Sequence, residues 1–81
     1  MTSTAEKTLR ILAEVADTAR VLSEPDLPIF DLGLLDSLGT VTLIAQLSEE
    51  FGVDISPAEF ERKDWATPAK IVQDMERRTG A

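Results

Sequence analysis

Residues 30–40 of the chain read FDLGLLDSLGT. The segment is apolar and contains Gly33, and an amphipathic pattern begins after Asp36 and Ser37. Asp and Ser both cap helices, because their side-chain oxygens accept backbone N–H groups that are unpaired in the first helical turn. The sequence therefore predicts a loop that becomes a helix at Asp36 or Ser37. It also places one exposed serine hydroxyl at the start of that helix.

The region before this junction should contain a helix and a structured loop. The helix is predicted to open with the capping box of residues 3–6 and to end within residues 17–23. Residues 24–35 contain two prolines and a glycine, which indicate a loop. Apolar residues are expected to attach both segments to the core. They are Leu9, Leu12, Val15, Ala16, Ala19 and Leu22 in the helix and Leu27, Ile29, Phe30, Leu32 and Leu34 in the loop.

The helix that starts at Asp36 or Ser37 should continue to Phe51 and stop at Gly52, a residue type common after helix ends. One broad apolar face of this helix is expected to meet the core. It consists of Leu38, Val41, Ile44, Ala45, Leu47, Ser48 and Phe51, with Leu43 nearby. Thr40, Thr42 and Gln46 should form its exposed and uncharged middle.

Two cap-and-proline signals follow. Residues 56–59 read SPAE and predict a short third helix. Thr67-Pro68 opens a last helix to about Arg78, with Ile71, Val72 and Met75 inward and Gly80 after its end. Because no alternation of period two is present, the predicted fold class is all-α. We expect a small four-helix bundle, three main helices plus one short helix, with a long first loop.

Length and composition fit one soluble domain. The chain has 81 residues, of which 43% are hydrophobic, so we expect a single domain over residues 1–81 with a core at about 4–78. No apolar run approaches the roughly 20 residues of a membrane span, and the first residues lack a signal-peptide pattern. The expectation is a cytoplasmic monomer without membrane insertion.

The residue types that are missing restrict the chemistry. The chain has no Cys, His or Tyr. It therefore lacks thiolate nucleophiles, thiolate metal ligands and the commonest general base near neutral pH. We predict no catalytic residue, no metal site and a protein that is not an enzyme. A serine hydroxyl alone is a poor nucleophile, so Ser37 would need a partner enzyme to modify it.

Charge indicates which partners are favoured. The net charge is −7, and no Lys or Arg lies between Arg20 and Arg62. Such a surface repels phosphate backbones, so nucleic acid is an unfavourable partner. It would speed encounter with basic protein surfaces.

Two stretches, residues 33–41 (GLLDSLGTV) and 59–71 (EFERKDWATPAKI), resemble the acyl and peptidyl carrier family. Both stretches look closer to one branch, the D-alanyl carrier proteins, the second being the more specific match, and the resemblance covers nearly the whole chain. It implies a 4′-phosphopantetheine group from coenzyme A, attached covalently to Ser37 by a phosphopantetheinyl transferase. Leu38 matches the wider family, whereas the D-alanyl branch typically has Met at this position.

The resemblance also implies a shuttle. An adenylating amino-acid ligase would load an amino acid as a thioester, and a downstream acyltransferase would accept it. The cargo is expected to be D-alanine for teichoic acid in cell wall biogenesis. The other cargo considered is an amino-acid or β-amino-acid starter unit in antibiotic or polyketide biosynthesis.

Partner recognition is expected around the modified serine and on flanking acids. The residues concerned are Asp36, Leu38, Gly39, Thr40, Glu49, Asp54 and Glu59. Leu38, Val41 and Phe51 are expected in the core first, with Leu38 also bordering the partner surface. Trp65 is expected to be a packing anchor.

Two other functions remain open at this level. The chain could be an unmodified acidic helical module that binds a basic partner protein, with Ser37 only a cap. An ordinary fatty-acid carrier is disfavoured by residues 59–71 and by the neutral face of the second helix.

Overall fold

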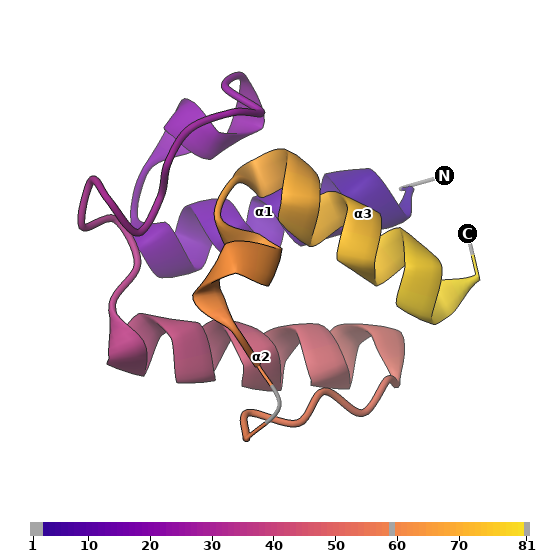
Figure 1. Cartoon of the computed structure of the whole chain (residues 1–81). Helices are drawn as coiled ribbons and strands as arrows, with labels where there is room; N and C mark the ends of the chain where they lie inside the picture. Colours follow the sequence, from indigo (N-terminus) through magenta and orange to yellow (C-terminus); the bar gives the residue numbers. More distant parts are fainter. Residues whose placement is uncertain (1–2, 59, 81) are drawn as a thin grey trace.

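Three α-helices, two short 3-10 helices and a long loop make up the computed structural model (Figure 1). The helices are α1 (Thr4–Ala16), α2 (Ser37–Phe51) and α3 (Pro68–Thr79), and the 3-10 helices are η1 (Ala19–Leu22) and η2 (Arg62–Trp65). The structure describes residues 3–58 and 60–80, and these ranges contain no β-strand. The predicted all-α class is confirmed for this part of the chain.

The helices share one hydrophobic core. α1 contacts both α2 and α3, and buried side chains from all three helices belong to a single cluster. The start of α1 and the end of α3 lie on the same side of the molecule (Figure 1). α2 begins on the opposite side, where the long loop reaches it (Figure 1). The loop-to-helix junction therefore lies on the side of the molecule opposite to the start of α1 and the end of α3 (Figure 1).

Side-chain and backbone caps fix the helix boundaries. Ser3 Oγ accepts a hydrogen bond from the backbone N–H of Glu6 at 3.1 Å, and Thr67 Oγ1 accepts one from Lys70 at 3.3 Å. Gly52 ends α2 in the left-handed region, with φ of 64°, which glycine adopts without steric cost. The starts and stops predicted at these three positions are confirmed.

α1 ends before its apolar spacing does. Asp17 adopts a left-handed φ of 55°, and its backbone N–H donates to the carbonyl of Ala13, which closes the helix. The chain turns there and enters η1, and Leu22 at the end of η1 is 53% exposed. The expected helical face is therefore wrong for Ala19 and Leu22, because the turn at Asp17 breaks the helical periodicity.

The short third helix expected at residues 56–59 is not found among the described residues 56–58. Residues 57–58 form a turn instead, and the backbone N–H of Phe60 donates to the carbonyl of Pro57 at 3.4 Å. A proline with its fixed φ suits a β-turn as well as a first helical turn, so the pattern fitted both. The short helical segment lies later, at η2, where the buried Trp65 anchors it.

α2 buries a narrower face than expected. Leu43 and Leu47 are fully buried and Ile44 nearly so, but Leu38 is 76% exposed and Val41 53% exposed. The core positions expected for Leu38 and Val41 are wrong. Leu35 from the preceding loop is buried against the first turn of α2, so the core beside this turn is already filled. Ala45 is also exposed, whereas Phe51 packs partly against the core as expected.

Backbone hydrogen bonds connect the long loop to the segment between η2 and α3 and to the first turn of α3. The backbone N–H of Ile29 donates to the carbonyl of Ala66 at 3.2 Å, and that of Ala69 to the carbonyl of Pro25 at 3.0 Å. Leu27 and Ile29 are buried, as expected for a structured loop. Leu32, in contrast, is 48% exposed and does not contribute to the core.

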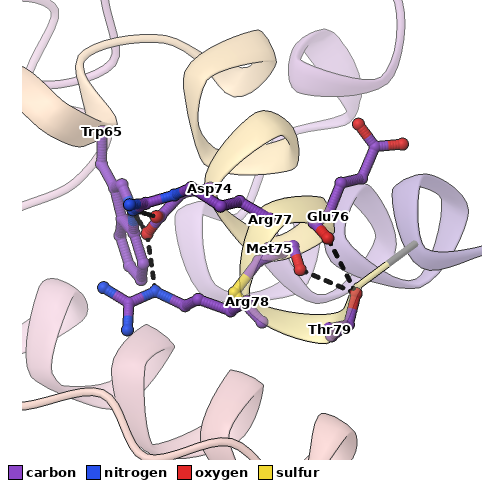
Figure 2. A network of polar contacts seen from close by, with 7 residues as sticks. All are labelled: Trp65, Asp74, Met75, Glu76, Arg77, Arg78 and Thr79. Carbon is purple, nitrogen blue, oxygen red and sulfur yellow. Dashed lines mark hydrogen bonds and ion pairs between the residues drawn. The ribbon is translucent and has the colours of Figure 1, made fainter.

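A buried polar network joins η2 to α3 (Figure 2). Trp65 is 1% exposed, and its indole Nε1 donates to Asp74 Oδ2 at 2.8 Å. Arg78 Nε also donates to Asp74 Oδ2, at 3.0 Å, and Arg77 donates to Asp74 Oδ1. The predicted anchor role of Trp65 is confirmed. Its indole N–H also satisfies part of a carboxylate that is only 9% exposed.

This network makes stability depend on pH. Burial raises the pKa of the Asp74 carboxyl, but hydrogen bonds from Trp65, Arg77 and Arg78 together outweigh burial and hold the pKa below its ordinary value. The stabilisation is present above the ordinary pKa of about 3.9 and is lost as pH falls through the lower folded-state pKa. We expect the melting temperature to fall below about pH 4. Asp74→Asn should make the melting temperature less dependent on pH below about pH 4. If the melting temperature of this variant falls as steeply as that of the wild type, Asp74 is not the group responsible.

Candidate functional site

The helix start at the loop-to-helix junction is fixed by Asp36. Asp36 Oδ1 accepts a hydrogen bond from the backbone N–H of Gly39 at 2.7 Å. Thr40 Oγ1 donates to the backbone carbonyl of Asp36, also at 2.7 Å. Asp36 is therefore the N-cap and Ser37 is the first residue of α2. The structure thus decides between the two starting positions that the sequence left open.

Ser37 is exposed and its side chain does not cap the helix. Within residues 3–58 and 60–80, its hydroxyl makes no hydrogen bond. The hydroxyl lies in the first turn of α2, where backbone N–H groups and the helix dipole favour a negatively charged group. The position suits a hydroxyl that an external enzyme modifies with a phosphate.

Gly39 allows Leu35 and Asp36 to pack closely against the first turn of α2. A Cβ atom at this position would lie 3.1 Å from Leu35 Cδ1 and 3.2 Å from Asp36 Oδ1. Both distances are shorter than ordinary van der Waals contact, so any side chain here would push against the buried leucine and the capping carboxylate. Gly39 therefore allows the first turn of α2 to pack closely against Leu35 and Asp36, and its role in partner recognition stays a prediction.

A small hollow of about 240 Å³ lies directly beside Ser37. Its walls are partly apolar and include one cation. The lining residues are Ser37, Thr40, Val41, Ile44, Pro57, Phe60 and Arg62. The guanidinium carbon of Arg62 lies 5.2 Å from the centroid of the Phe30 ring, a cation–π distance. α2, η2 and the segment between them thus meet beside Ser37, and Arg62 connects this hollow to Phe30 of the long loop.

A second hollow lies beside the junction, between α1 and α2. It brings together three of the predicted recognition residues, Asp36, Leu38 and Gly39. The remaining lining comes from Glu14, Val15, Thr42 and Gln46. Leu38 is 76% exposed, more than the other exposed large apolar side chains, Leu22, Leu32 and Val41. An apolar side chain so exposed next to Ser37 suits contact with a partner better than a role in the core.

The other predicted recognition residues do not join this cluster. Thr40 is 7% exposed and lines the hollow beside Ser37, so its expected exposure is wrong. Its hydroxyl is occupied by the bond to Asp36. Glu49 is exposed but lies about 18 Å along the helix axis from Ser37. Asp54 is exposed in the segment after α2, and Glu59 lies outside the described residues.

Sequence reasoning assigned only Ser37 and Thr40 of the residues that line the hollow beside Ser37 to the site, and it missed the others, which are Val41, Ile44, Pro57, Phe60 and Arg62. Neither Phe30 nor Arg62 was assigned to it, although Arg62 is the first cation after the long stretch without Lys or Arg. The position of Arg62 at the end of this stretch was the available signal in the sequence. It could not show that η2 returns to Ser37, because this depends on the tertiary contact between η2 and α2.

Residues 3–58 and 60–80 contain neither a candidate metal-ligand group nor a candidate membrane-spanning helix. Among residues 3–58 and 60–80, no group of three or more His, Cys, Asp or Glu side chains is placed to hold a metal ion. In the same residues, no helix has the length and apolar character needed to cross a membrane.

Comparison with known proteins defines the class. Residues 6–75 match the family model of the phosphopantetheine attachment site, and the chain belongs to this family of carrier proteins. It is 46% identical over 69 residues to a D-alanyl carrier protein of Lacticaseibacillus rhamnosus, covering 85% of each chain. The protein is thus a carrier with a covalent 4′-phosphopantetheine group, as the sequence resemblance implied. This membership favours a carrier over the unmodified interaction module.

The geometry beside Ser37 fits such a group. The exposed hydroxyl offers an attachment atom, and the first turn of α2 and the guanidinium of Arg62 both favour a phosphodiester. Val41 and Phe60 provide apolar surface for a pantoyl chain. Membership of this carrier family supports a non-catalytic role for the chain.

Proposed function

We propose that Ser37 bears the 4′-phosphopantetheine group and that the chain carries an amino acid between partner enzymes. The observation that supports the attachment site best is the division of roles at the start of α2. Asp36 caps the helix, and the hydroxyl of Ser37 is left exposed in the first turn. A serine that only capped the helix would direct its oxygen to a backbone N–H.

The residues of the chain hold and orient the group. The attached pantetheine supplies a terminal thiol, which holds the cargo as a thioester. The backbone N–H groups of the first turn and Arg62 stabilise the phosphodiester by charge, and Arg62 is itself positioned over Phe30. The open, shallow hollow leaves the far end of the group accessible to partners.

The proposed cargo is an amino acid, with D-alanine first. The support is the 46% identity to a protein named a D-alanyl carrier protein. An adenylating ligase would load the amino acid and a downstream acyltransferase would remove it. An amino-acid starter unit for a natural product is the other cargo, because residue 38 is Leu, as in the wider carrier family.

The single cluster of buried side chains supports one carrier domain for the whole chain.

Intact mass tests the proposal directly. The chain is incubated with coenzyme A and a phosphopantetheinyl transferase, and a gain of one phosphopantetheine is expected. The product is then presented to the cognate ligase with single amino acids, and the mass gained identifies the cargo. A chain that stays unmodified with an active transferase would exclude the carrier function.

Leu38 is the proposed apolar contact for partners. Its side chain is 76% exposed, so Leu38→Ala should change the free energy of unfolding by less than about 0.5 kcal/mol. If a partner buries this side chain, kcat/KM for loading should fall roughly tenfold. Leu22→Ala removes another exposed leucine, which is 53% exposed and lies outside the site, and serves as the control. Equal kinetics in the two variants would rule out the contact.

A further inference from the structure

One hollow of this acidic protein, which Ser37 does not line, is rich in basic residues. This cavity of about 500 Å³ is formed by residues of η2, of α3 and of the segment before η2. Half of the eight Lys and Arg residues of the chain line it. They are Lys63, Lys70, Arg77 and Arg78. The described lining residues also include two carboxylates, Asp64 and Asp74, so these residues have a net charge of +2 in a protein of net charge −7.

The two arginines are held in place before any ligand arrives. Arg77 and Arg78 both donate to Asp74, whose Oδ2 also accepts a hydrogen bond from the indole of Trp65 (Figure 2). A guanidinium has five N–H donors, so one bond to Asp74 leaves the others of each side chain for a ligand. Ordering of the donors in advance lowers the entropy cost of binding.

The two lysines approach the cavity from different elements. Lys70 Nζ on α3 lies 3.5 Å from the backbone carbonyl of Lys63 on η2, so its charge is directed toward η2. Lys63 Nζ lies 3.0 Å from Glu61 Oε2, and its side chain is 78% exposed. Among the described residues, no carboxylate forms an ion pair with Lys70. Ser56 and Gln73 add neutral polar groups to the lining.

We propose that this cavity binds a phosphate group, either of a free phosphorylated small molecule or of an anionic lipid headgroup. A phosphate presents several acceptor oxygens and more than one negative charge, which suits two forked guanidinium groups and two ammonium groups. The positive lining repels the ammonium of an aminoacyl cargo, so the site is distinct from the cargo of the carrier. Phosphate binding in this cavity would be a function separate from the attachment of the 4′-phosphopantetheine group at Ser37.

The cavity contains its own optical reporter and contacts the attachment site. Trp65 is the single tryptophan of the chain and lines the cavity, so binding should alter its fluorescence. Phe60 lines both this cavity and the hollow beside Ser37, and its ring packs edge-on against Trp65 with centroids 5.0 Å apart. A ligand in the cavity therefore lies one side chain away from the proposed arm.

The test uses the full chain and two probes. Inorganic pyrophosphate is titrated at constant ionic strength while Trp65 fluorescence and heat of binding are followed. In a second arm, co-sedimentation with phosphatidylglycerol vesicles is compared with phosphatidylcholine vesicles. The variant is Lys63→Gln with Lys70→Gln. The control is Lys7→Gln with Arg10→Gln, which removes the same charge from α1, outside the cavity.

We expect saturable binding of at least one probe, weakened roughly tenfold in the cavity variant and nearly unchanged in the control. Binding of pyrophosphate assigns the site to a free phosphate compound, and binding of vesicles alone assigns it to a lipid headgroup. If neither probe binds saturably, or if the control pair loses as much affinity as the cavity pair, the proposal is overturned. Far-UV circular dichroism verifies that both variants are folded.

Discussion

Ser37→Ala should abolish transfer of phosphopantetheine to this chain while leaving its fold intact. The proposed attachment atom is the serine oxygen, and the substitution removes it completely. The free energy of unfolding should change by less than about 0.5 kcal/mol, because the side chain is exposed and Asp36 forms the cap. The measurements are intact mass after incubation with coenzyme A and a transferase, and urea unfolding of the same sample.

Two controls separate the hydroxyl from the helix start. Asp36→Ala removes the bond to the N–H of Gly39 and should cost about 1 kcal/mol, but it keeps the attachment oxygen. Ser23→Ala removes an exposed loop serine and should be modified as fully as the wild-type chain. A mass gain in Ser37→Ala would place the attachment elsewhere. A cost of about 1 kcal/mol for Ser37→Ala would show that this side chain caps the helix after all.

Trp65→Ala should be among the most destabilising single substitutions in this chain, by about 3–5 kcal/mol. The indole is 1% exposed and connects η2 to α3, so its loss opens a cavity in the core. It also removes the N–H donor of Asp74, a carboxylate that is largely buried. A small domain has about 5–15 kcal/mol of stability, so a large part of the total would be lost.

The packing and hydrogen-bond contributions of Trp65 can be separated by urea unfolding followed by circular dichroism. Trp65→Phe retains an aromatic ring but not the donor to Asp74, and it should cost about 1–3 kcal/mol. Lys63→Ala removes an exposed side chain from the same 3-10 helix and should stay within about 0.5 kcal/mol of the wild type. A cost below about 1 kcal/mol for Trp65→Ala would show that this indole does not anchor η2.

Sequence reasoning was most successful where the decisive contacts are local. Ser3 and Thr67 bond to N–H groups three residues away, and Gly52 is defined by its own φ. The exposed serine at the start of α2 follows from the same kind of signal. The sequence offered Asp36 and Ser37 as equivalent caps, and the structure assigned that role to Asp36.

Predictions failed where the sequence pattern fitted more than one structure. The C-cap of α1 at Asp17 lies within the predicted range of residues 17–23, but the apolar face expected to continue to Leu22 does not form beyond it. The SPAE pattern suited a turn at residues 57–58 as well as a helix. In both regions the local pattern is compatible with a helix and with a turn.

By itself, the sequence determined the helical class, most helix boundaries, the acidic charge and the position of the exposed serine in the chain. These properties depend on composition and on bonds spanning at most four residues. Only the tertiary structure decided that Leu35 fills the core beside α2 and leaves Leu38 and Val41 exposed, that Arg62 lies by Ser37, and that four cations surround one cavity. Each of these depends on which helix face meets a distant segment, and one-dimensional periodicity does not specify that pairing.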